Sequence, residues 1–154
     1  MQNENPKING QYQTMIVLWA ALLMSQLIFI LLIFLTRPQL FTLDFSQHFF
    51  GNSMAQILGF ALAAITVVIL SFAFRKKFNE RAVQEQNPAL VQSGLIIACA
   101  LCEASSLFGL ALAFAFDYQY FFFWFALGIT GILLHFPRKD ALLAASYKKH
   151  SAVD

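Results

Sequence analysis

The chain has 154 residues, of which 59% are hydrophobic and 12% are charged, and 18 of them are Phe. A soluble domain of this size cannot hide so much apolar surface, so the composition excludes an ordinary globular protein and predicts an integral membrane protein. The net charge of +2 comes without a basic stripe interleaved with aromatic residues, so nucleic acid is not an expected partner.

Four apolar stretches are long enough to cross a hydrocarbon core of about 30 Å as helices, which takes about 20 residues. They are residues 15–35, 54–74, 90–116 and 118–136. None of them alternates as the strands of a closed barrel do. The sequence therefore predicts an all-α fold, a membrane four-helix bundle forming a single domain over residues 1–154, with residues 137–154 as a tail. The first stretch is interpreted as a retained span, because no small-residue cleavage pattern follows it.

The basic residues predict the orientation. The first and third loops hold only Arg37, and the other nine of the ten Lys and Arg residues lie in the tails and the second loop. By the positive-inside rule, both termini and the loop at residues 75–88 are cytoplasmic. We expect a multi-pass protein of the bacterial inner membrane, with the lipid bilayer as one partner.

The connecting segments differ in character. Residues 37–53 mix Leu and Phe with polar residues and are expected to lie in the outer membrane interface. The connection at residues 117–120 is so short that the third and fourth spans must be antiparallel neighbours. Asn87-Pro88 is a turn signal that starts the third helix. The tail is expected to add an amphipathic turn or two through Leu142, Leu143 and Tyr147.

Small residues predict how the helices pack. Close backbone approach needs small side chains, because lipid gives apolar helices no hydrophobic reason to associate. The third span has two such rows, so we expect it at the centre of the bundle. One row is Gly94, Ala98, Cys102 and Ser106, and the other is Ser105, Gly109 and Ala113. Matching surfaces are expected at Gly59 and Ala63 of the second span and at Gly128 and Gly131 of the fourth.

Glu103 is the only acidic residue inside the four stretches, and it lies at the middle of its own. Acidic residues at this depth usually face protein or water and mark ion or proton sites. Alignment by depth gives four possible partners for the carboxyl, and these are Ser25, Gln26, Thr66 and Ser106. No basic residue in any span can pair with a carboxylate, so we expect a neutral carboxyl at physiological pH. Two interpretations follow: a carboxyl that exchanges protons, or a structural acid.

A run of residues around Glu103 has a further pattern. It begins with Gln84-Glu85-Gln86-Asn87-Pro88, continues through Ala100-Leu101-Cys102-Glu103-Ala104 and ends in Phe108-Gly109-Leu110. Residues 84–116 thereby resemble the loop and carboxylate-bearing helix of the rotary ATP synthase c subunit. The resemblance implies that Glu103 corresponds to the ion-carrying carboxylate and that Asn87 and Pro88 correspond to the loop motif.

The rest of the chain departs from that family. The second stretch lacks the repeated Gly-x-Gly pattern of the family, and further stretches flank the hairpin on both sides. The chain as a whole also resembles small uncharacterised bacterial four-helix membrane proteins, which have a similar Glu-bearing helix and an aromatic-rich last span. That second resemblance implies no activity.

Other chemistry has little support in the sequence. Cys99 and Cys102 form a Cys-x-x-Cys pair, which membrane oxidoreductases use, but they lie at mid-depth and the chain has no further cysteine. We interpret them as small apolar packing residues. His48, His135 and His150 have no metal-site spacing, and no phosphate-binding or dinucleotide motif occurs. The sequence predicts neither an enzyme nor a cofactor.

Two functions remain at this point. The first is a structural or accessory membrane protein that binds other membrane subunits, or a second copy of itself, through its small-residue faces and its aromatic outer segments. The alternative is a proton or ion translocating subunit in which Glu103 carries the ion. The two differ in whether a neutral amide can replace the carboxyl.

Overall fold

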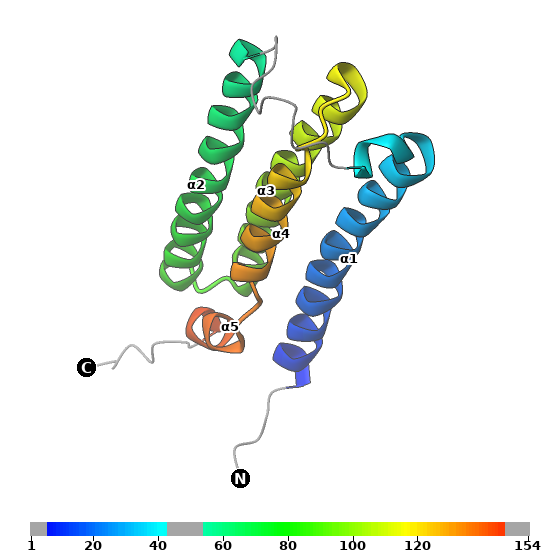
Figure 1. The fold of residues 1–154 in the computed structure, drawn as a ribbon. Helices are drawn as coiled ribbons and strands as arrows, with labels where there is room; N and C mark the ends of the chain where they lie inside the picture. The colour runs from blue at the N-terminus through cyan, green and yellow to red at the C-terminus, as the bar shows by residue number, and fades with distance from the viewer. Residues whose placement is uncertain (1–5, 43–53, 147–154) are drawn as a thin grey trace, which may run out of the picture.

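The computed structural model describes residues 6–42 and 54–146 (Figure 1). All regular structure in these residues is helical, which confirms the predicted all-α class. The helices are α1 (Pro6–Thr36), the 3-10 helix η1 (Pro38–Phe41), α2 (Met54–Gln84), α3 (Pro88–Phe116), α4 (Phe122–Leu134) and α5 (Lys139–Ser146).

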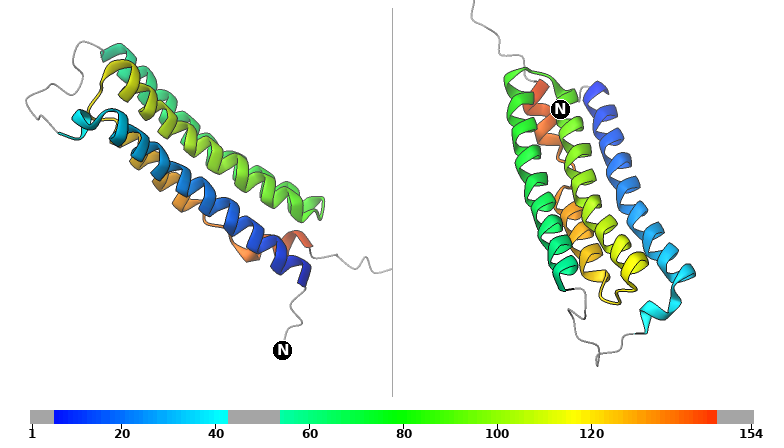
Figure 2. Two further views of the ribbon diagram at one scale, coloured as in Figure 1. Left: turned by 90° about the vertical axis from the view of Figure 1, so that its right-hand side faces the viewer. Right: turned by 90° about the horizontal axis from the view of Figure 1, so that it is seen from above.

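The third helix, α3, is the centre of the molecule and contacts each of α1, α2, α4 and α5. Helices α1 and α2 lie along opposite flanks, and α4 packs antiparallel against α3, in front of it in Figure 1 (Figures 1 and 2). The start of α1 and the whole of α5 lie at the same end of the bundle (Figure 1). We call this the basic end, formed by residues 75–88 and 137–146, and we call the other the aromatic end, formed by residues 37–42 and 117–121.

Three helices have the length and apolar composition needed to cross a membrane. They are residues 8–36 of α1, all of α2 and all of α3. Helix α4 has only 13 residues, or about 20 Å at 1.5 Å per residue, which is less than a hydrocarbon core. The fourth span predicted at residues 118–136 is therefore shorter in the structure. Asp117 ends α3 in the left-handed conformation with φ 48°, residues 118–121 form the turn that follows, and α4 stops before Pro137.

Two of the long helices extend beyond their predicted bounds. Helix α1 begins at Pro6 rather than at residue 15, and α2 continues through most of the predicted loop at residues 75–88. Residues 75–84 contain neither Gly nor Pro, and pairs four residues apart support the added turns. Arg81 Nε lies 2.5 Å from a Glu85 oxygen and Lys76 Nζ lies 3.9 Å from Glu80. Only residues 85–87 connect α2 to α3.

The start of α3 follows the predicted turn signal. The Asn87 side chain accepts a hydrogen bond from the Ala89 backbone N–H at 3.1 Å, and Pro88 occupies the first helical position. Gln86 has a φ of 50°, which turns the chain sharply between two antiparallel helices. The cap satisfies one of the backbone N–H groups that a helix start leaves without partners.

Glycine positions show how closely the helices approach. A Cβ on Gly94 would lie 2.6 Å from Phe78 Cβ of α2, and one on Gly109 would lie 2.8 Å from Trp124 Cβ of α4. A Cβ on Gly131 of α4 would lie 2.6 Å from Cys102 Sγ. The rows of small residues on α3 therefore face α2 and α4, and Ala98 and Cys102 are fully buried there. Gly59 has no atom within 4 Å of a Cβ placed on it, so it makes no such contact.

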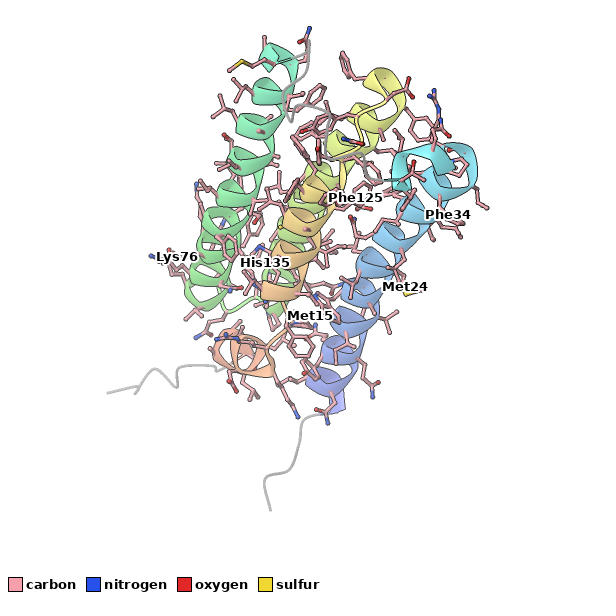
Figure 3. All side chains as sticks on the ribbon, viewed as in Figure 1. Met15, Met24, Phe34, Lys76, Phe125 and His135 are labelled. Carbon is pink, nitrogen blue, oxygen red and sulfur yellow. The ribbon has the colours of Figure 1, made fainter. Side chains whose placement is uncertain are left out.

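The two ends of the bundle are closed differently. At the basic end, α5 buries Leu142 against the core cluster that includes Met15, which lies on the inner side of α1 in Figure 3. Leu143 is exposed, and Tyr147, the third residue of the predicted amphipathic segment, lies outside the described residues. At the aromatic end, Leu40 of η1 is buried and Arg37 forms an ion pair with Asp117. The rest of the predicted interfacial segment, residues 43–53, also lies outside the described residues.

Candidate functional site

Glu103 lies at the middle of α3, and its side chain contacts α1. Its Oε1 accepts a hydrogen bond of 2.5 Å from the Ser25 hydroxyl of α1. The carboxyl is half-buried, and its helix neighbours Ile96, Ala100 and Leu107 form an exposed stripe along α3. Glu103 therefore lies at the edge of the outward-facing surface of α3 and is not enclosed by the bundle.

Ser25 has one proton and two acceptors within reach. The Leu22 carbonyl oxygen lies 2.7 Å from Ser25 Oγ, and Glu103 Oε1 lies 2.5 Å from it. If the carboxyl carries a proton, it donates that proton to Ser25 Oγ and the serine proton remains with Leu22. If the carboxyl is ionised, it accepts the serine proton, and the Leu22 carbonyl keeps the backbone N–H that α1 supplies.

Gln26 adds a second polar group beside this contact. Its side chain is fully buried, and its Nε2 lies 3.5 Å from Ser25 Oγ, at the limit for a hydrogen bond. No group among the described residues donates to its Oε1. A buried amide oxygen without a donor is costly in an apolar surrounding, so it marks a site where a further donor stabilises the molecule.

The structure does not bring the other two predicted partners to the carboxyl. Thr66 is exposed on α2, and its hydroxyl donates to the Leu62 carbonyl of its own helix at 2.7 Å. Ser106 is fully buried at the α3–α4 contact, where a Cβ on Gly128 would meet Ser106 Oγ. The expected polar layer is thus reduced to Glu103, Ser25 and Gln26.

A second polar cluster lies toward the basic end and was not predicted from the sequence. Ser71 Oγ of α2 lies 2.8 Å from His135 Nε2, and the Cys102 thiol donates to the same oxygen at 3.3 Å. The Arg75 guanidinium donates to the backbone carbonyl of His135 and, at 3.0 Å, to that of Phe136. Ser71, Cys102 and His135 are all buried. This cluster joins α2, α3 and the end of α4.

The sequence carried a signal for this cluster that alignment by depth could have used. Ser71 and Arg75 lie one turn apart near the end of the second span, and His135 lies near the corresponding end of the fourth. The spacing of His135 in the sequence excludes a metal site but does not indicate a hydrogen-bonding partner on another helix. Since three different helices supply the groups, their distances depend on tertiary packing.

Neither a disulfide nor a metal site accompanies the two clusters. Cys99 and Cys102 are free and buried. The described residues contain no group of three His, Cys, Asp or Glu side chains that could hold a metal ion. The contact that Cys102 makes with Ser71 and Gly131 is a packing contact with a weak S–H donor.

Comparison with protein-family models, with curated proteins and with solved structures finds no match to this chain. The resemblance of residues 84–116 to the rotary c subunit stays a prediction from the sequence.

Proposed function

We propose that the chain is a multi-pass protein of the bacterial inner membrane that serves as a structural or accessory subunit of a membrane assembly. In this proposal, both termini lie in the cytoplasm, and another membrane helix packs over Glu103 at the seam of α1 and α3. The occupant of the seam is a second copy of the chain or another membrane protein.

The observation that carries the proposal is the half-buried carboxyl on an outward-facing stripe. Ile96 and Leu107, on either side of Glu103 along α3, are 38% and 44% exposed. A carboxyl that faces hydrocarbon at mid-depth is costly even when it is neutral, because lipid tails offer it no hydrogen-bonding partner. A partner helix that supplies a hydrogen-bonding group over Glu103 removes this cost, and polar groups hold membrane helices together in this way.

The surface beside the carboxyl suits a partner helix. On α1, Met24, Ile28 and Leu31 are 53% to 61% exposed and flank Ser25 on its outer side. Met24 points away from the bundle in Figure 3. Apolar residues on this face fit lipid and protein equally well, so the polar Glu103–Ser25 pair is the feature that favours protein.

A second candidate function is proton or ion translocation, and the partial exposure of the Glu103 side chain favours it. A carboxyl at the surface of the bundle can exchange a proton with a neighbouring subunit. However, no hydrogen bond among residues 6–42 and 54–146 connects Glu103 with the Ser71–His135 cluster. The accessory role needs no such relay and is therefore the better supported of the two.

Photo-crosslinking in native membranes tests the proposal. A photoreactive amino acid at Leu107, on the stripe beside Glu103, is expected to give a protein adduct. The same amino acid at Leu62, which is 67% exposed on α2, serves as the control and is expected to react with lipid only. Adducts with lipid alone from both positions would contradict the accessory role.

Substitution of Glu103 separates the two functions. Glu103→Gln keeps the shape and hydrogen bonding of a neutral acid, so the adduct at Leu107 should persist, whereas Glu103→Leu should abolish it. If proton flux in reconstituted vesicles is present and vanishes in Glu103→Gln while the adduct persists, translocation is the function.

A further inference from the structure

A hollow of about 440 Å³ opens at the basic end, between α2 and the segment that joins α4 to α5. Three basic side chains line it: Arg75 and Lys76 of α2, and Arg138 of the connecting segment. Ligand sites in proteins have volumes of this order, about 300 to 1,000 Å³. The only acidic residue in its lining is Glu80, so the lining carries three positive charges and one negative charge.

The three positive charges of the lining lie close together, and nearby acidic groups do not fully neutralise them. The Arg75 guanidinium donates to the carbonyls of His135 and Phe136, which are neutral acceptors and do not cancel its charge. The charge of Arg138 repels that of Arg75. Among the described residues, the single ion pair in the lining is that of Lys76 and Glu80, at 3.9 Å and with both side chains largely exposed. An exposed ion pair of this kind is weak and does not neutralise the lining. The hollow therefore keeps a net positive charge that favours a bound anion.

The apolar part of the lining places the hollow at a boundary. Phe72, Leu134 and Phe136 also line it, and each is more than 40% exposed. Phe72 and Lys76 are one turn apart on α2, so the wall changes from apolar to basic within about 6 Å of helix. Lys76 and His135, labelled in Figure 3, mark the two sides of the hollow. Such a change occurs where hydrocarbon gives way to lipid headgroups.

We propose that this hollow binds the headgroup of an anionic phospholipid, with the phosphate against Arg75, Lys76 and Arg138 and an acyl chain along Phe72, Leu134 and Phe136. Basic pockets between membrane helices recognise acidic headgroups in this way. The inference does not depend on the partner proposed for Glu103, which lies nearer mid-depth.

Native mass spectrometry of the full chain in neutral detergent micelles tests the proposal. Phosphatidylglycerol is titrated against phosphatidylcholine, and the number and affinity of retained lipids are measured. Lys76→Gln/Arg138→Gln is expected to weaken phosphatidylglycerol binding about 30-fold, since each basic residue near a lipid surface contributes roughly fivefold. Arg75 is left unchanged, because it also holds the two carbonyls at the end of α4.

The control is Lys77→Gln/Arg81→Gln, which removes the same amount of charge from the basic end, at two positions of α2 that lie outside the hollow. It is expected to retain at least a third of the affinity, and circular dichroism verifies that both double variants remain helical. Three results would each overturn the proposal: equal weakening in the two double variants, equal retention of phosphatidylcholine and phosphatidylglycerol, or displacement of the lipid by inorganic phosphate at equal concentration.

Discussion

His135 and Ser71 show how single polar residues connect helices inside an apolar protein. Their contact of 2.8 Å joins α4 to α2, and the Cys102 thiol adds α3 to the same oxygen. Each group is buried, so each depends on the others to replace the hydrogen bonds that water would supply. The sequence named Cys102 only as a packing residue, but the structure gives its thiol a polar partner as well.

Ser71→Ala should therefore destabilise the protein. The change leaves His135 Nε2 and the Cys102 thiol without their common partner, and we expect a loss of about 0.6 to 1.7 kcal/mol, from the average to the largest value for hydrogen bonds between membrane helices. Thr66→Ala is the matched control on α2, because its hydroxyl is exposed and donates only to its own helix. The free energy of unfolding in mixed micelles, followed by Trp fluorescence, measures both; equal losses would contradict a stabilising role for the Ser71–His135 contact.

At the scale of elements, the short helix α4 is held by close backbone approach to α3. A Cβ on Gly128 would lie 2.8 Å from the Cys102 carbonyl oxygen, which belongs to the backbone and cannot rotate away. The Trp19 indole of α1 also donates to the Ile132 carbonyl of α4 at 2.8 Å. The position of this 13-residue helix therefore depends on its contacts with the neighbouring helices more than on its own length.

Gly128→Ala should separate α4 from α3. We expect a loss of about 1 to 3 kcal/mol, as for overpacking in a closely packed core. Gly59→Ala adds the same methyl group where nothing lies within 4 Å, and it should cost nothing or stabilise α2 slightly through helix propensity. Unfolding of both variants in mixed micelles measures the difference, and an unchanged Gly128→Ala protein would mean that α4 is not packed as described.

At the scale of the whole molecule, an experiment can show on which side of the membrane the basic end and the aromatic end each lie. The positive-inside rule predicts that Gln39 of η1 faces outward and that Gln84 of α2 faces the cytoplasm. A maleimide that does not cross membranes should label Gln39→Cys in intact cells, and should label Gln84→Cys only after permeabilisation. The native Cys99 and Cys102 are buried, so the unmodified protein should give a low background. Labelling of both positions from outside would contradict the predicted crossing pattern.

Local properties of the sequence determined the helical class, three of the long apolar helices and the start of α3. Apolar length and turn residues depend on the chain itself, as the Asn87 cap and Pro88 show. The bounds were less well predicted: charge suggested a loop at residues 75–88, but pairs four residues apart on α2 allow the helix to continue through Gln84. The apolar run at residues 118–136 did not reveal that its first four residues form a turn.

The tertiary structure alone decided which polar groups meet. Glu103, Ser25, Gln26, Thr66 and Ser106 could all be aligned by depth, but depth does not determine which way a residue faces around its helix. The fit of Gly94, Gly109 and Gly131 against their neighbours fixes how α2, α3 and α4 are rotated against one another, and it places Ser106 against Gly128. Ser25 meets Glu103 where α1 packs on α3. The same packing turns Thr66 outward and brings Ser71 to His135. The sequence by itself thus specified an apolar helical chain with one central acid, and helix packing specified its partners.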